Sequence, residues 1–276
     1  MAHASNEVGA ILRDWRARRR LSQLDLALDA DVSPRHLSFV ETGRARPSRE
    51  LLLRLSEQLD VPRRDQNALL LAAGFAPAFP ERDLADPALD VVRAALDTVL
   101  TAHEPFPALI VDRHLTMISA NRALAPLIEG VDPGLLEPPV NVLRLTLHPD
   151  GVSKNIVNLA EWRGFLLRAL DREIAQSGDT VLIALREEMD LYPKGPASDV
   201  RPRDFAGVAV PFRFQRGDRV LSFYSARTVF GSPIDITLDD LALETFLPAD
   251  AQTAEAMRIL CPAVQALPTR QPRVAQ

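Results

Sequence analysis

The chain is poor in the residue types that disulfide, metal and redox sites depend on. It holds a single cysteine among 276 residues, Cys261, which excludes an internal disulfide and a cysteine-rich zinc site. The five histidines show no metal-ligand spacing, so we expect no structural metal site. No apolar run is long enough to cross a membrane and no signal-peptide pattern opens the chain, which predicts a cytoplasmic protein without a membrane partner.

Catalytic motifs are also missing. The sequence contains no Gly-x-Ser-x-Gly elbow, no phosphate-binding loop and no dinucleotide fingerprint. His148 and Asp150 could suggest acid–base chemistry, but the run His-Pro-Asp-Gly is more simply a turn. We therefore predict that the protein is not an enzyme and that it holds no cofactor.

The composition, 47% hydrophobic and 25% charged, is that of an ordinary globular protein, and the length favours two domains. The formal net charge of −5 excludes a protein that coats nucleic acid non-specifically. The charge is uneven along the chain: residues 1–80 hold twelve arginines against ten acidic residues, whereas the remainder is acidic. This asymmetry favours a locally basic face at the N-terminal end, carried by an acidic body.

Two short helices joined by a tight turn are predicted within residues 21–49. Ser22 can cap the first helix, with Asp25 three residues later as its capping-box partner. Spacings of three and four residues predict that this helix buries Leu24, Ala27 and Leu28.

The second of these helices has equally clear boundaries. Ser33 can cap it and Pro34 occupies its first position, where the missing N–H has no cost. Leu37 and Val40 are expected to point inward, and Gly43 can adopt the left-handed backbone that ends the helix. The pattern predicts a helix-turn-helix, which presents a short helix to the major groove of DNA.

Residues 8–74 resemble the DNA-binding domain of phage repressors and of the xenobiotic-response-element family of bacterial regulators. The residues that carry the resemblance are Gln23, Ala27, Val32-Ser33 and Glu41-x-Gly43-x-x-x-Pro47-Ser48. Asp31 departs from the family, which usually has glycine in this turn, but aspartate tolerates a left-handed backbone. The resemblance implies an all-α, five-helix, lambda-repressor-like domain in which Arg16 and Glu41 form a structural ion pair.

A double-stranded DNA operator is the partner that follows from this resemblance, with a homodimer on a nearly palindromic site. Arg35 is expected to bind guanine O6 and N7. Phe39 is expected either to touch thymine methyl groups or to pack on its own loop. Gln23 is a phosphate contact by family resemblance, and the arginines of the following loop should bind the backbone. The full set of expected DNA-binding residues is Gln23, Ser33, Arg35, His36, Ser38, Phe39, Arg44 and Arg46.

The proline-rich stretch FAPAFPERDLADP marks the expected domain boundary. The predicted organisation is a DNA-binding domain over 6–75, a linker over 76–86, a connecting helix plus sensor domain over 87–262, and a disordered tail over 263–276. The helix expected over 87–103 carries an apolar seam of two heptads. It either packs on its own domain or also meets its twin in a dimer.

The body changes to a strand pattern after residue 106. PALIVD and LTMISAN predict two strands, and DFAGVAVPFRF and RVLSFYSARTVFG predict two more, joined by a turn at Arg216-Gly217-Asp218. A helical stretch over about 155–192 lies between the pairs, and helices from about Leu238 and Ala251 are expected to close the chain. The order of these elements resembles a PAS-type sensor domain, an α+β fold with an antiparallel sheet.

Residues 103–260 also resemble the MmyB-like ligand-binding domain found in bacterial regulators. The supporting runs are NVLRLTLHPDGV, NLAEWRGFLLRAL and FGSPIDITLDDLALETFLPAD. The resemblance implies a transcription regulator whose sensor has an apolar cavity for a small lipophilic effector, such as a fatty-acyl compound. The residues proposed to line it are Asn121, Arg144, His148, Trp162, Phe165, Phe212, Phe214 and Phe223. Ordinary core packing of the aromatics and a body that is a protein-interaction module without a ligand remain as alternatives.

Overall fold

The computed structural model describes residues 2–195, 210–229 and 235–262. The chain divides into two units. The first comprises residues 1–88, 167–187 and 229–241, and the second, here called the sheet unit, comprises residues 89–166, 188–228 and 242–276. The tail predicted to be disordered, 263–276, lies outside the described residues, as does the start of the predicted strand at 204–214.

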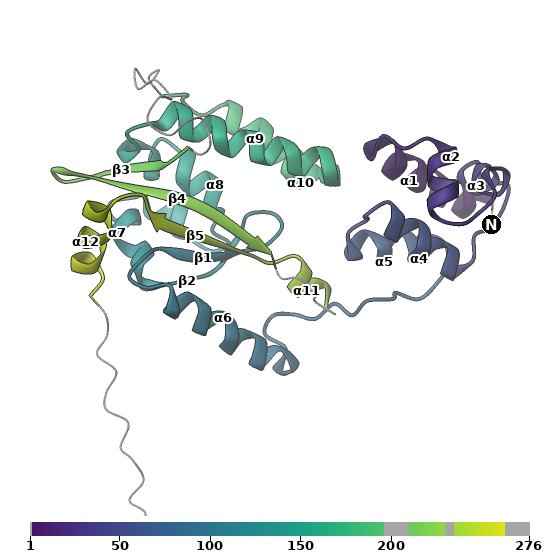
Figure 1. Ribbon diagram of the computed structural model, residues 1–276, viewed down its shortest axis with the longest axis horizontal. Helices are drawn as coiled ribbons and strands as arrows, with labels where there is room; N and C mark the ends of the chain where they lie inside the picture. Colours follow the sequence, from purple (N-terminus) through teal and green to yellow (C-terminus); the bar gives the residue numbers. More distant parts are fainter. Residues whose placement is uncertain (1, 196–209, 230–234, 263–276) are drawn as a thin grey trace, which may run out of the picture. The chain divides into compact units, whose positions relative to one another are not determined.

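Five helices form an N-terminal bundle within the first unit (Figure 1). They are α1 (Ala2–Arg18), α2 (Gln23–Asp29), α3 (Pro34–Glu41), α4 (Arg49–Gln58) and α5 (Arg63–Ala72). The serine caps predicted from the sequence are present: the side chains of Ser22, Ser33 and Ser48 each accept a hydrogen bond from a first-turn backbone N–H. The predicted capping box between Ser22 and Asp25 is complete.

A continuous apolar core holds this bundle together. α1 contributes Val8, Leu12 and Trp15, and α4 contributes three leucines along one face. The turn between α2 and α3 uses a left-handed backbone at Asp31 (φ 50°), as the sequence predicts, and Gly43 (φ 72°) ends α3 in the same way.

The predicted apolar face of α2 was wrong. Leu24 and Leu28 are 55% and 69% exposed, whereas Leu26 and Ala27 are fully buried. Leu26 and Ala27 share a helical face with Ala30, which is also fully buried, so periodicity alone could not choose between the two faces. The choice follows from the packing of α2 against α3 and α4, which buries the face that carries Leu26.

A five-stranded sheet in the order β2-β1-β5-β4-β3 forms the centre of the sheet unit (Figure 1). Its strands are β1 (Ala108–Val111), β2 (Met117–Ala120), β3 (Phe212–Arg216), β4 (Arg219–Val229) and β5 (Ala242–Pro248). The β1–β2, β1–β5 and β3–β4 pairs are antiparallel. β1 lies between two strands and is buried along its whole length, and the predicted hairpin turn is present at Gly217 (φ 54°).

The sheet unit also contains the helices α6 (Asp90–Ala102), α7 (Ala125–Ile128), α8 (Val142–Leu147) and α12 (Ala251–Leu260), and the first half of α9 (Leu159–Ser177). The rest of α9, most of α10 (Thr180–Asp190) and all of α11 (Ile236–Asp239) fall in the first unit. Short 3-10 turns lie at Pro87–Leu89, Arg122–Leu124, Pro133–Leu136 and Val152–Asn155. α7 and α12 lie side by side and share the core that also contains Trp162 and three phenylalanines of β3 and β4.

One strand of the sheet was missed in the sequence. The helix expected from about Leu238 ends at Asp239, and residues 242–248 form β5. β5 pairs with β1, more than 130 residues away, with Leu243 opposite Ile110. Such a long-range partner leaves no local signal in the sequence.

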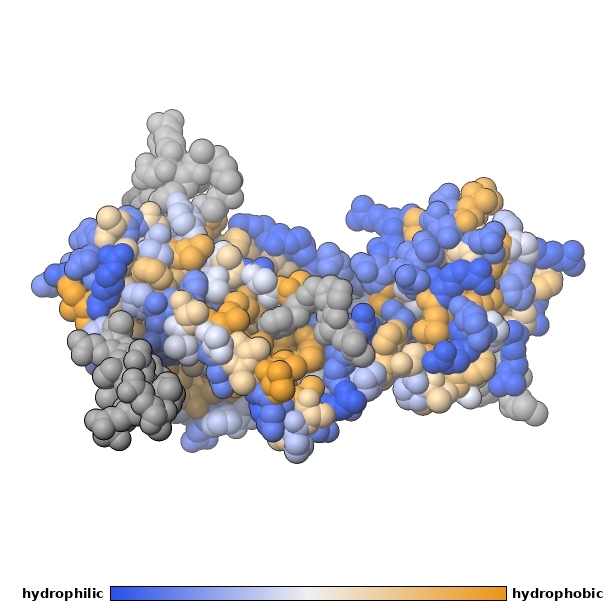
Figure 2. Space-filling model, turned by 60° about the horizontal axis from the view of Figure 1, so that its bottom comes forward, coloured by the Kyte–Doolittle hydropathy of each residue, from blue (hydrophilic) through white to orange (hydrophobic). Residues whose placement is uncertain are grey.

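Apolar side chains also reach the surface in scattered groups among hydrophilic ones on the face drawn in Figure 2. In the part of the chain that the structure describes, no helix is both long and apolar enough to span a membrane.

Candidate nucleic-acid interface and ligand pocket

A buried carboxylate connects α1, α2 and α3 of the N-terminal bundle. Glu41, fully buried at the end of α3, accepts hydrogen bonds from Arg16 Nε (2.7 Å) and Nη2 (2.9 Å). The amide of Gln23 donates to the same carboxylate at 2.7 Å. The ion pair expected from the resemblance is therefore confirmed, and it fixes α3 relative to both earlier helices.

The charge state of Glu41 follows from its neighbours. Burial alone would raise the pKa of the Glu41 carboxyl, but hydrogen bonds from Arg16 and Gln23 outweigh it and hold the pKa below its ordinary value. The hydrogen bond to Glu41 in turn raises the pKa of Arg16. The Arg16–Glu41 pair is thus ionised at neutral pH, and its contacts hold the C-terminal end of α3 against α1 and α2.

The N-terminal half of α3 faces solvent. Arg35 and His36 are exposed, while Leu37 and Val40 point into the core as predicted. Ser33 is occupied as the cap, since its hydroxyl accepts from His36 N at 3.2 Å. The side chains of Arg35 and His36 are therefore accessible to a partner at the start of α3.

The middle and end of α3 carry the other predicted contacts. Ser38 and Phe39 are half-buried, and the Arg35 guanidinium lies over the Phe39 ring, 5.4 Å from its centroid. The loop after α3 exposes Arg44 and Arg46. Exposed arginines beside such a helix suit phosphate oxygens of a DNA backbone.

Gln23 has a different environment from the one that the resemblance implies. Its side-chain amide is engaged with Glu41 and is only half-exposed. Its role as a phosphate contact stays a prediction, because the hydrogen bond that its side chain makes in the structure is within the protein.

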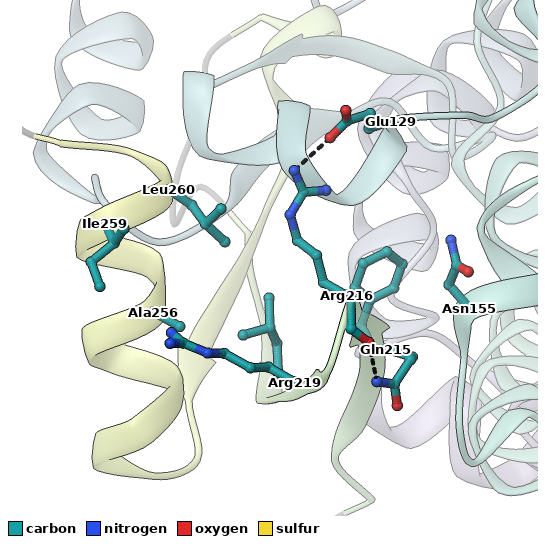
Figure 3. A pocket seen from close by; sticks show the side chains of 11 residues that line it. Glu129, Asn155, Gln215, Arg216, Arg219, Ala256, Ile259 and Leu260 are labelled. Carbon is teal, nitrogen blue, oxygen red and sulfur yellow. Dashed lines mark hydrogen bonds and ion pairs between the residues drawn. The ribbon is translucent and has the colours of Figure 1, made fainter.

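A pocket of about 670 Å³ opens on the sheet unit between the β3–β4 hairpin and α12 (Figure 3). Its apolar wall is formed by Phe214, Leu221, Ala256, Ile259 and Leu260. The rest of the lining consists of Gly217 and the polar residues Glu129, Asn155, Gln215, Arg216 and Arg219.

An ion pair crosses the rim of this pocket. Arg216 Nη2 contacts Glu129 Oε2 at 2.5 Å (Figure 3). Arg216 Nη1 also donates to the Pro126 carbonyl oxygen at 2.6 Å. A second hollow of about 470 Å³ lies beyond it and shares Glu129, Arg216 and Leu260 with the first. The Arg216–Glu129 ion pair therefore forms part of the lining of both hollows.

The predicted ligand-binding residues fall into separate groups, and one of them, Phe214, lines the pocket of Figure 3. The aromatics gather into one cluster: Trp162 stacks on Phe165 with centroids 5.1 Å apart and meets Phe212 at 5.3 Å, and Phe212 lies 6.3 Å from Phe223. Trp162, Phe212, Phe214 and Phe223 are all buried in one core.

The predicted polar anchors are engaged inside the protein. Asn121 is buried, where its amide donates to the carbonyl oxygens of Leu100 (3.1 Å) and Phe106 (2.8 Å) and its oxygen accepts from Ala108 N. Arg144 pairs with Glu188 at 2.8 Å.

His148 joins the same polar group. Its ring makes an edge contact with Tyr192, with centroids 5.2 Å apart, and the Tyr192 hydroxyl donates to Glu188 at 2.6 Å. Burial, followed by the bond to Glu188, raises the pKa of Tyr192 to about 12.

Comparison with protein families gives this architecture its context. Residues 92–260, more than half of the chain, match the model of the MmyB-like transcription regulator ligand binding domain. The chain belongs to the MmyB-like transcription regulators. Residues 12–66 of the regulator match a helix-turn-helix family, so it is a DNA-binding transcription regulator with a ligand-binding domain.

A solved structure also resembles part of the regulator. The crystal structure of the clp gene regulator ClgR from Corynebacterium glutamicum is 28% identical, covering 37% of this chain and 95% of that one, with a TM-score of 0.23. At that TM-score the similarity carries no structural argument. No curated protein matches the regulator at a significant level.

Two features of the regulator's sites were not predicted from the sequence. Gly9 packs against the end of α3 so closely that an added Cβ would lie 2.5 Å from the Glu41 carbonyl oxygen. The two rim residues of the pocket, Glu129 and Arg216, come from segments 87 residues apart. A helical glycine could have suggested the first, but no local pattern indicates the second.

Proposed function

We propose that the regulator binds an approximately palindromic operator as a homodimer, and that a small lipophilic effector in its C-terminal domain changes its affinity for DNA. The proposal of DNA binding rests on the structure of α3. Its first residues are exposed, while its C-terminal end is fixed through the buried Glu41 carboxylate. A rigid helix with a free, cationic N-terminal half suits direct reading of base edges.

The eight expected contacts divide into two kinds. Arg35, with His36, Ser38 and Phe39 as lesser contributors, would contact bases, because they lie on the exposed or half-exposed side of α3. Gln23, Ser33, Arg44 and Arg46 would contact the DNA backbone and supply affinity that depends on salt. One such helix covers half an operator, so two copies with half-sites about 34–36 Å apart are expected.

The proposal of a small lipophilic effector rests on the family and on the pocket of Figure 3. Its apolar wall suits a hydrocarbon chain, and the polar rim at Arg216, Arg219 and Asn155 suits a polar end group. An effector changes DNA affinity only if it binds the DNA-competent and DNA-incompetent arrangements with different affinities.

Selection of a random-sequence duplex pool with the purified full chain tests the DNA half. We expect a single enriched motif with two-fold symmetry, and a footprint that covers both half-sites. No enriched motif would exclude sequence-specific binding, and protection of one asymmetric half-site by a monomer would exclude the dimer.

Solvent extraction of the purified protein, followed by a thermal-shift series with acyl compounds of increasing chain length, tests the effector half. Ile259→Trp should fill the pocket and abolish the shift, because Ile259 is an exposed lining residue. Glu255→Trp, on the same helix but outside the lining, should leave the shift unchanged. No extracted compound and no shift would favour the interaction-module alternative.

A further inference from the structure

Arg35 and Phe39 form a contact on the exposed side of α3. They are four residues apart, and the Arg35 guanidinium carbon lies 5.4 Å from the centroid of the Phe39 ring. Side chains on a helix lean towards its N-terminus, so the ring of Phe39 leans back over the turn that carries Arg35. The side chain of Arg35 is exposed, and no described carboxylate pairs with it.

The loop that follows α3 holds the backbone of Phe39. The Phe39 carbonyl oxygen accepts hydrogen bonds from the backbone N–H groups of Arg44 (2.8 Å) and Ala45 (3.1 Å). Phe39 is also half-buried, whereas Arg35 is exposed. The ring is therefore the more rigid partner, and the guanidinium is the part that it restrains.

We propose that Phe39 is a positioning residue for Arg35: its ring face holds the guanidinium in the orientation that reads guanine. The inference rests on the proposed DNA-binding function and replaces the expected contact between Phe39 and a thymine methyl group. A planar guanidinium can stack on an aromatic face and still donate its two parallel N–H groups. Restraint before binding reduces the rotamer freedom that the long arginine side chain loses on the DNA.

The test uses the full-length protein and the duplex that it selects from a random pool. Phe39→Leu, which keeps apolar bulk but removes the ring face, should weaken binding about three- to tenfold. Phe39→Tyr should bind like the wild type. In an Arg35→Ala background, Phe39→Leu should change nothing further, because the group that the ring restrains has gone.

Base analogues separate positioning from direct contact. Replacing the contacted guanine by 7-deazaguanine removes the N7 acceptor, and should weaken the wild type and shrink the effect of Phe39→Leu. Replacing each thymine by uracil removes its methyl group and should leave the effect of Phe39→Leu on binding intact. If uracil abolishes that effect, Phe39 contacts the DNA itself and the proposal is overturned. The same conclusion follows if Phe39→Leu weakens binding equally in the Arg35→Ala background.

A third variant covers the case in which Phe39→Leu impairs folding. Pentafluorophenylalanine at position 39 keeps the ring's shape but withdraws electrons from its face, so it should weaken binding only when Arg35 is present. Equal binding by the fluorinated and natural proteins would also overturn the proposal. A wild-type protein that selects no motif would instead reject the DNA-binding function itself.

Discussion

Replacing Arg16 by methionine should destabilise the N-terminal bundle strongly. The change removes both charged hydrogen bonds to Glu41 and leaves this fully buried carboxylate with the Gln23 amide as its side-chain donor. Breaking a buried ion pair in this way costs about 3–5 kcal/mol. A bundle of about 70 residues has a free energy of unfolding of roughly 4–10 kcal/mol, so much of it would be lost.

The loss should depend on pH in a defined direction. In the wild type, the pKa of Glu41 is lower folded than unfolded, so its stabilising contribution is full above its ordinary pKa and is lost as the pH falls through the folded value. Without Arg16, burial raises the folded pKa above the unfolded one, so the variant loses stability as the pH rises through that value. The difference in unfolding free energy between variant and wild type should therefore narrow from pH 7 to pH 4.

Urea unfolding followed by tryptophan fluorescence measures this difference in the full chain. The chain has two tryptophans, Trp15 in the bundle and Trp162 in the sheet unit, so a Trp162→Phe background makes the signal specific to the bundle. Arg54→Met is the matched control, because Arg54 is exposed and forms no ion pair with any described residue. A loss below about 1 kcal/mol at pH 7, or one unchanged at pH 4, would refute the reasoning.

Three further predictions follow from individual contacts. Gly9→Ala should lower the bundle's melting temperature despite alanine's better helix propensity, since the new Cβ would lie 2.5 Å from the Glu41 carbonyl oxygen; an unchanged or raised temperature would contradict this packing. Asn121→Leu should destabilise the sheet unit by about 2–4 kcal/mol, because it leaves buried backbone groups without hydrogen-bond partners. Urea unfolding followed by Trp162 fluorescence measures this loss, and a loss under about 1 kcal/mol would contradict that role of Asn121. Arg44→Ala and Arg46→Ala should each reduce the slope of log affinity against log salt by about one, and equal slopes would exclude phosphate contacts.

Local chemistry made much of the N-terminal bundle predictable. Serine caps, a proline at a first helical position and a glycine with a left-handed backbone act within a few residues, so Ser22, Ser33, Pro34 and Gly43 marked the helix ends correctly. The pairing of Arg16 with Glu41 came from family resemblance instead, since residues 25 positions apart have no local signal.

The errors came where distant partners decide the structure. Leu24 and Leu28 have the spacing of a buried face, but α3 and α4 bury the face of Leu26. β5 exists because β1 pairs with it, and the pocket rim joins Glu129 to Arg216 across the chain. Periodicity cannot detect such contacts, because it reports the shape of one segment rather than what covers it.

The most direct measurement is the operator preference of Arg35→Ala, determined by selection and by titration of the selected duplex at moderate salt. If α3 reads the major groove through Arg35, the variant should lose preference for guanine at one position in each half-site and bind about 5- to 150-fold more weakly. Unchanged sequence preference and unchanged affinity would show that α3 does not read the DNA in this way.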